Sequence, residues 1–470
     1  MSCFDKFPDL PGPEETAFCK INEVYCCGDA RYGNISTFTN SIKNHPKINV
    51  TKDFHHHKLS DENISMYVDV EDNLLKRITS VWFKQGFLEA LSVAADPNDN
   101  RDSKARAAAL KVANLFTALR KPKQPHLKDI GEKIVSKYSR TRNWGSAPVK
   151  CMAWHPHTTK IALATADDYV RVYCSEVSFV STLKCKAQRH VSTLSWRPYS
   201  ASEIAVGCEQ GVIVWTVDPN STFTKPSSSN AVVLKRSGHS PVTDISWSPC
   251  GKSLLSCCVA DKSILLWDVA KGTAKRMFKT SFGHLILVSW VSKQKKVGWW
   301  KKFAEKCHKF RLFGVQSVRR EPLVAKGCRA FCWGPNGVGL FAPRSERCLF
   351  VVNDTSSRRV KTRDSQEVLD LTKVELPTGD TVGGRILDMC WDPTGRYLAL
   401  LFKKSYIIAV FNTTQHMMQL NVTPCCYIRG VDNEVPSTFA FQQNFKDGAC
   451  LTIAWSSGRI QYFPIINTDS

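Results

Sequence analysis

The sequence predicts an all-β fold built from short strands that recur along most of the chain. The first observation is the stretch 238–268, which begins with Gly-His, ends with Trp-Asp and holds three strand-like segments joined by tight turns. This layout is typical of a WD repeat, one blade of a β-propeller. The second observation is that six further units align with it. We therefore predict a seven-bladed WD-repeat β-propeller with an N-terminal extension containing two or three α-helices.

The strands of the stretch 238–268 have the residues that a buried blade needs. Val242, Ile245 and Trp247 suit an inner strand that faces neighbouring blades on both sides. Gly251 supplies the turn that follows, because glycine adopts positive φ at no steric cost. Leu254 and its neighbours fill the next strand.

Polar residues of the same stretch have the spacing of a structural network. In this repeat class His239, Asp261 and Trp267, together with Ser256, form a buried hydrogen-bond chain that locks the blade. A histidine, an aspartate and a serine could also form a hydrolase triad. We prefer the structural interpretation, because the spacing is that of the blade.

The seven units share an aromatic residue that closes the inner strand. These residues are Trp154, Trp196, Trp247, Trp290, Trp333, Trp391 and Phe441. Consecutive members lie 42 to 58 residues apart, and blade repeats of roughly 40–45 residues accept insertions in their loops. A third-strand signature follows in each unit, at 170–175, 212–217, 264–269, 310–315, 349–354, 407–412 and 460–465.

Closure of the ring requires a strand from outside the repeats. A propeller whose first and last blades are not joined leaves a sheet edge open to pairing. The last unit is followed by only a few residues, so the missing strand should come from before Trp154. We expect the alternating segment Thr16–Tyr25 to contribute it.

The chain divides into four parts. Residues 1–60 are an irregular segment with the blade-closing strand, 61–143 are helical, 144–466 form the propeller and 467–470 are a short tail. In the helical part, apolar residues recur at helical spacing and Pro122 ends an Ala- and Leu-rich stretch. The run His55–His57 in the first part fits a solvated loop better than a metal site, because no other ligand lies at metal-binding spacing.

Composition narrows the function classes. The net charge of +22 favours acidic partners, such as nucleic acid, an anionic membrane or an acidic protein surface. We find neither a secretory signal nor an apolar run long enough to span a membrane, so the 19 cysteines are expected to be reduced thiols. No motif for a P-loop, a nucleophile elbow or a zinc site is present. We therefore expect no enzymatic activity, no cofactor and no metal.

The fourth unit departs from the pattern. Residues 293–320 carry ten Lys or Arg against one acidic residue. The preferred interpretation is a divergent strand with a solvated basic hairpin. The alternatives are a helix that binds a membrane surface or an acidic partner, a nucleic-acid site, and an error in the gene model. The residues that would form the partner or membrane surface are Trp299, Trp300, Lys301, Lys302, Phe303 and Lys306.

Several stretches carry a specific resemblance to a known family: 126–157, 167–173, 196–202, 213–219, 225–229, 238–243, 444–449 and 455–460. Through these stretches the sequence resembles the Aladin family of WD-repeat nucleoporins. The resemblance covers roughly residues 60–466, is most specific over 126–270 and is poor over 291–309.

This resemblance implies a non-enzymatic scaffold of the nuclear pore complex at the nuclear envelope. It implies other nucleoporins as partners, in particular a transmembrane nucleoporin of the pore membrane, and a role in protein import into the nucleus. It also implies spindle proteins as partners, with a location on the spindle and in the cytoplasm in mitosis. Direct nucleic-acid binding is not expected, and peripheral membrane contact is an alternative.

Overall fold

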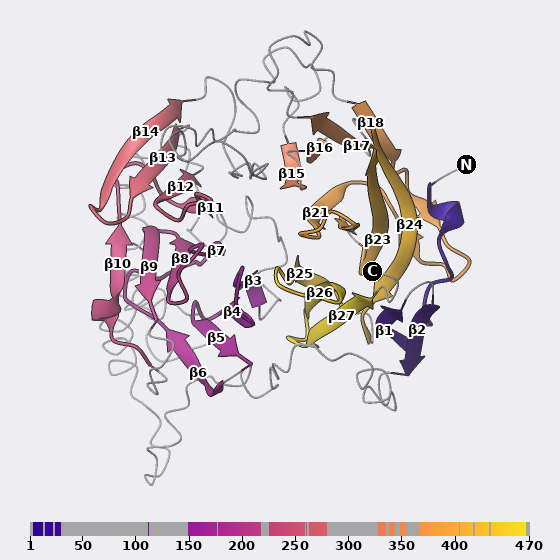
Figure 1. Cartoon of the computed structure of the whole chain (residues 1–470), viewed down its shortest axis with the longest axis horizontal. Coiled ribbons are helices and arrows are strands. Elements are labelled where there is room, and N and C mark those ends of the chain that lie inside the picture. The colour runs from indigo at the N-terminus through magenta and orange to yellow at the C-terminus, as the bar shows by residue number, and fades with distance from the viewer. Residues whose placement is uncertain are drawn as a thin grey trace, which may run out of the picture.

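The computed structural model describes residues 3–29, 149–279, 328–353 and 366–466, with short gaps inside each range, and Lys111. These residues form six blade-like sheets and one small hairpin. Figure 1 shows the sheets standing side by side around a common centre. The predicted N-terminal helices and the fourth unit, around Trp290, lie outside the described residues.

Blades one to three are antiparallel sheets of four strands each. Blade one contains β3 (Val149–Trp154), β4 (Lys160–Thr165), β5 (Val170–Cys174) and β6 (Val177–Leu183). Blade two contains β7 (Thr193–Trp196), β8 (Glu203–Cys208), β9 (Gly211–Thr216), the 3-10 helix η3 (Ser228–Asn230) and β10 (Ala231–Leu234). Blade three contains β11 (Val242–Trp247), β12 (Ser253–Cys258), β13 (Ser263–Asp268) and β14 (Thr273–Lys279).

The remaining blades follow the same plan. Blade five contains β15 (Cys328–Trp333), β16 (Val338–Pro343), β17 (Cys348–Asn353) and β18 (Gln366–Asp370). A hairpin of β19 (Val374–Glu375) and β20 (Thr381–Val382) leads to blade six. Blade six contains β21 (Ile386–Trp391), β22 (Tyr397–Phe402), β23 (Ile407–His416) and β24 (Gln419–Arg429). Blade seven contains β25 (Pro436–Phe441), β26 (Gly448–Trp455) and β27 (Ile460–Ile466).

The inner strands occupy the positions that the aromatic markers predicted. The six described inner strands end on the predicted residues: Trp154, Trp196, Trp247, Trp333, Trp391 and Phe441. Inner strands of consecutive blades contact each other from β15 through β21, β25, β3 and β7 to β11, and they lie nearest the centre in Figure 1. The predicted all-β propeller class is therefore confirmed.

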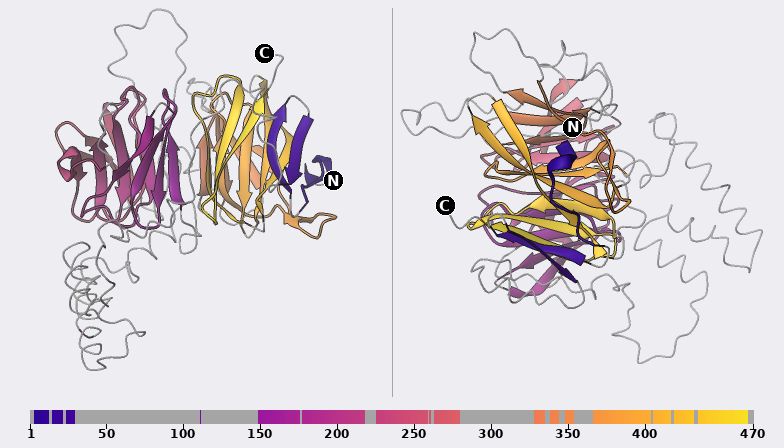
Figure 2. Two further views of the ribbon diagram at one scale, coloured as in Figure 1. Left: turned by 90° about the horizontal axis from the view of Figure 1, so that it is seen from below. Right: turned by 90° about the vertical axis from the view of Figure 1, so that its right-hand side faces the viewer.

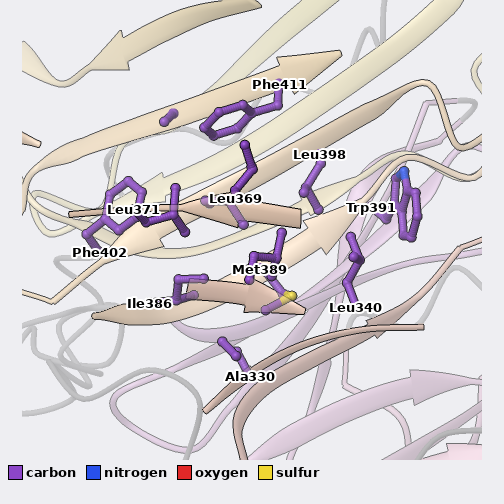
Figure 3. Close-up of a cluster of buried hydrophobic side chains, with 14 of the residues drawn as sticks. Ala330, Leu340, Leu369, Leu371, Ile386, Met389, Trp391, Leu398, Phe402 and Phe411 are labelled. Carbon is purple, nitrogen blue, oxygen red and sulfur yellow. The ribbon is translucent and has the colours of Figure 1, made fainter. Parts of the chain in front are cut away.

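The core lies between the blades, since each pair of consecutive described blades packs face to face. All six residues of β22 are buried, as expected for a strand covered on two sides. Figure 3 shows this packing between blades five and six, where Ala330 and Leu340 lie beside Met389 and Leu398.

The N-terminal arm, residues 3–29, completes blade seven. It contains the 3-10 helix η1 (Cys3–Lys6), β1 (Glu15–Ile21) and β2 (Val24–Asp29). β1 pairs in parallel with β27, and β2 pairs antiparallel with β1, so blade seven has the strand order β2-β1-β27-β26-β25. Both views of Figure 2 show these indigo strands beside the yellow ones. Residues from the two ends of the sequence thus share one sheet, at the place proposed for Thr16–Tyr25.

Aromatic side chains fasten the start of the arm to blade six. Phe4 is buried and meets Phe402 edge to face, with ring centroids 5.8 Å apart. Phe7 stacks on Tyr427 at 4.3 Å and meets Phe411 edge to face at 5.0 Å. The arm therefore connects blade six to blade seven.

Candidate functional site: the blade locks

The structure brings together three of the four residues of the network predicted for blade three. The indole Nε1 of Trp267 donates to Oγ of Ser256 at 2.8 Å, and the same Oγ lies 2.8 Å from Nε2 of His239. On the other side of the imidazole, Sγ of Cys258 lies 3.4 Å from Nδ1. Asp261 lies outside the described residues.

This arrangement does not suit a hydrolase. His239, Ser256 and Trp267 are at most 2% exposed, so no substrate can reach the serine hydroxyl. The hydroxyl oxygen also accepts the indole hydrogen bond, which ties it to the third strand. The geometry serves to join the entry loop, β12 and β13 of one blade.

Blade two has an equivalent lock built from different residues. Gln188 precedes Trp196 by the same eight residues by which His239 precedes Trp247. Its Oε1 accepts from Nε1 of Trp215 at 2.9 Å, and its Nε2 donates to the backbone oxygens of Leu183 and Asp168 at 3.0 and 2.8 Å. The longer glutamine side chain reaches the tryptophan directly. Alignment on the inner tryptophan could have found this residue, but a search for the Gly-His pair could not.

Asp168 joins blade one to the loop that enters blade two. Its carboxylate accepts from Nζ of Lys150 at 3.0 Å and from the backbone N–H groups of His190 and Val191 at 2.8 and 3.0 Å. Burial acts to raise the pKa of Asp168, but Lys150, Lys184 and these N–H groups outweigh it, so the pKa is lowered. The carboxylate is therefore held in its charged form inside the lock.

The inner tryptophans of blades two and three also tie their blade to the one before it. Nε1 of Trp196 donates to the backbone oxygen of Ala153 at 3.0 Å, and Nε1 of Trp247 donates to that of Ser195 at 3.1 Å. Each acceptor is the residue before the tryptophan of the previous blade. The sequence marked these residues as strand ends but gave no sign of this second role.

A buried ion pair fastens the β19–β20 hairpin to blade six. Nη1 of Arg429 lies 2.9 Å from Oδ2 of Asp380, and the hydroxyl of Tyr406 donates to Oδ1 at 2.5 Å. Both charged side chains are at most 10% exposed. No sequence motif indicated this contact, because 49 residues separate the two partners.

The described part of the chain holds no metal-ligand cluster, and several of its buried cysteines have raised pKa values. No three His, Cys, Asp or Glu side chains there lie close enough to hold a metal ion. The cysteines of these ranges are free thiols, and burial raises the pKa of Cys151 and of Cys208 to about 12. Such thiols stay protonated at neutral pH and are poor nucleophiles. Among the same residues, no helix has the length and apolar character needed to cross a bilayer.

The predicted partner or membrane surface cannot be placed. Its residues Trp299, Trp300, Lys301, Lys302, Phe303 and Lys306 all lie outside the described residues. That surface stays a prediction from the sequence.

Comparisons with known proteins agree with the observed architecture. The family model described as "Aladin seven-bladed propeller" matches residues 130–466. "Aladin" of Arabidopsis thaliana is 24% identical over 313 residues, which cover 60% of this chain and 68% of that protein. A "Probable cytosolic iron-sulfur protein assembly protein 1" of Aspergillus flavus is 30% identical over 161 residues, which cover 28% of this chain and 35% of that protein.

A solved structure also aligns with the chain. A chain of the "Crystal Structure of Mitotic Checkpoint Complex" has a TM-score of 0.44 and 12% identity, covering 67% of this chain and 90% of its own. At that score we infer nothing from it. The family model, in contrast, spans well over half of the sequence and includes each of the locked blades described above. The chain therefore belongs to the Aladin seven-bladed propeller family.

Proposed function

We propose that this chain is a non-enzymatic scaffold nucleoporin that docks on a transmembrane protein of the pore membrane and supports protein import into the nucleus. The observation that carries the proposal is the family match over residues 130–466. The locks support it, because buried hydrogen bonds within blades two and three, together with the bonds that Trp196 and Trp247 make to the previous blade, hold the loops of the ring rigid. Spindle proteins are proposed as further partners in mitosis.

The proposal is tested by localisation and by neighbour identification in cells. The full chain, tagged at its C-terminus, is expected at the nuclear rim in pore-sized foci, and proximity labelling is expected to mark a transmembrane pore protein. The variant Lys271→Ala, which changes an exposed side chain, should show the same location. Diffuse staining of a well-folded chain, or labelling without any pore component, would contradict the proposal.

The import role needs a separate measurement. Depletion of the protein should slow nuclear accumulation of a fluorescent import reporter, and the full chain should restore the rate. If the protein localises to pores in undepleted control cells but import is normal in depleted cells, the transport role is excluded. The proposed docking at the pore would then still stand.

A second candidate function follows from the basic stretch 293–320. Its ten Lys or Arg residues and paired tryptophans favour a propeller adaptor that binds a membrane surface or nucleic acid. Liposome and RNA pull-downs of the chain with and without residues 293–309 test it. Equal binding by both proteins would remove this candidate.

A further inference from the structure

The turn between β7 and β8 holds an exposed tyrosine in a strained backbone conformation. Tyr199 is 78% exposed and has φ +61°. In the corresponding turns of blades three and six, the left-handed residue lies one position later and is a glycine, Gly251 at φ +70° and Gly395 at φ +76°. A side chain at such a φ is unfavourable, so the tyrosine is held there against its preference.

The other two described non-glycine residues with positive φ are held in that conformation by a blade lock, and Tyr199 is not. Asp168 and His190, the two other residues besides glycine with positive φ in these ranges, bond to each other within a blade lock. Tyr199 lies in none of the locks. Strained residues are concentrated at binding and switch sites, where the surrounding structure holds them in place.

Blade one holds the tyrosine from its own turn. The imidazole of His157 stacks on the Tyr199 ring, with centroids 5.1 Å apart and planes 24° from parallel. Nδ1 of the buried His155 accepts from the backbone N–H groups of His157 and Thr158 at 3.1 and 3.0 Å. Its Nε2 therefore carries the proton and donates to the oxygen of Ser200 at 2.9 Å. One buried histidine thus fixes both turns.

Blade three holds the same turn from the other side. Nε of Arg197 donates to the backbone oxygen of Gly251 at 2.6 Å, and Nη1 pairs with Glu203 at 2.6 Å. The guanidinium lies 5.4 Å from the ring centroid of Trp247. The turns 155–160, 197–203 and 248–252 therefore form one rigid surface, which we name the three-turn surface.

The three-turn surface is positively charged. It carries Lys160, Arg197 and Lys252 against the single acid Glu203, a net charge of +2 with histidine neutral. Glu203 is already engaged by Arg197, and Lys252 is exposed. An exposed, preorganised aromatic ring among cations suits an acidic partner, because the charges steer the encounter and the ring supplies a contact that costs little ordering.

We propose that the three-turn surface binds an acidic, extended segment of a partner protein, with the ring of Tyr199 as its anchor. This inference goes beyond the proposed function and does not depend on a location at the pore. It gives the strained tyrosine a role in binding a partner.

The experiment uses the purified full chain and peptides of defined charge. An array presents ten-residue peptides in matched acidic, neutral and basic sets, each with an alanine, proline or aromatic residue at the centre. The strongest acidic peptide is then labelled and titrated by fluorescence anisotropy. We expect acidic peptides with a central proline or aromatic residue to bind best, with affinity that falls as salt is added.

Three variants assign the binding to this surface. Tyr199→Gly removes the ring and introduces the residue that tolerates this φ, so the fold is retained; it should weaken binding about tenfold or more. Lys160→Glu with Lys252→Glu should weaken binding and reduce its salt dependence. Val232→Ala, which trims an exposed side chain on the outer strand of the same blade, should leave binding unchanged.

Each contrary result overturns the proposal. These results are preferential binding of the neutral or basic set, no binding by any acidic peptide, and equal affinity for the Tyr199→Gly variant. A labelled single-stranded oligonucleotide is the second probe. If it binds through Tyr199 while the acidic peptides do not, the surface recognises nucleic acid instead of a protein segment.

Discussion

Replacement of Phe4 by alanine should detach the N-terminal arm while leaving the rest of the ring folded. Phe4 is 3% exposed and lies in the cluster between blades five and six. It packs against Gly383, where any added Cβ would lie 2.8 Å from the phenyl ring. Gly383 has no side chain that could fill the space that Phe4 would leave.

The size of the effect follows from this burial. Truncation of a buried phenylalanine to alanine costs about 3–5 kcal/mol. Backbone pairing between β1 and β27 is short, since only Lys20 with Ile465 and Ile21 with Ile466 are in register. Buried hydrogen bonds also hold β1, such as the one from Nε2 of Gln461 to the backbone oxygen of Ala17 at 2.6 Å. If the arm opens independently of the ring, its open population rises by roughly two to more than three orders of magnitude.

Hydrogen–deuterium exchange resolved by peptide measures this opening. In Phe4→Ala, peptides covering β1 and β2 should exchange much faster, while those covering β25 and β26 keep their protection. Asp9→Ala is the matched control, because Asp9 is exposed on the same arm. Unchanged protection of β1 in a folded Phe4→Ala protein would refute the role given to this side chain.

Three further predictions concern the locks. Ser256→Ala leaves the buried Nε1 of Trp267 without its acceptor and should lower the unfolding free energy by about 1–3 kcal/mol in urea titrations; no loss would contradict the lock. Gln188→Ala removes the acceptor of Trp215 and the donor to two backbone oxygens, which should cost about 2–4 kcal/mol, and thermal melts that match the parent would exclude it. Asp168 has a lowered folded pKa, so its contribution to stability is present above the unfolded pKa of about 3.9 and is lost as pH falls through the folded value. Asp168→Asn should therefore lose less stability than the parent between pH 5 and pH 2, and parallel pH profiles would contradict this assignment.

The periodic features of the fold could be predicted from the sequence. An inner strand buried on both faces ends in a large aromatic residue next to a turn, so the markers from Trp154 to Phe441 located the described inner strands to the residue. Strand periodicity and turn chemistry are local, and they are visible without the partner strands.

Contacts between distant residues could not be predicted in this way. Gln188 takes the position that His239 has in blade three, and its longer side chain reaches Trp215 directly. This contact is apparent only in the folded blade. The Arg429–Asp380 pair and the stack of Phe7 on Tyr427 join segments with no shared motif. The conformation of Tyr199 is set by neighbouring blades, so its sequence context alone looks like an ordinary polar turn.

The origin of the strands of blade seven has a consequence for synthesis on the ribosome. Its sheet combines residues 15–29 with residues 436–466, so the early strands are synthesised long before the late ones. At roughly 5–20 residues per second, β1 leaves the ribosome about 20–90 s before the strand beside which it lies. During that interval the edge of β1 that later pairs with β27 lacks its partner and is open to pairing with other chains.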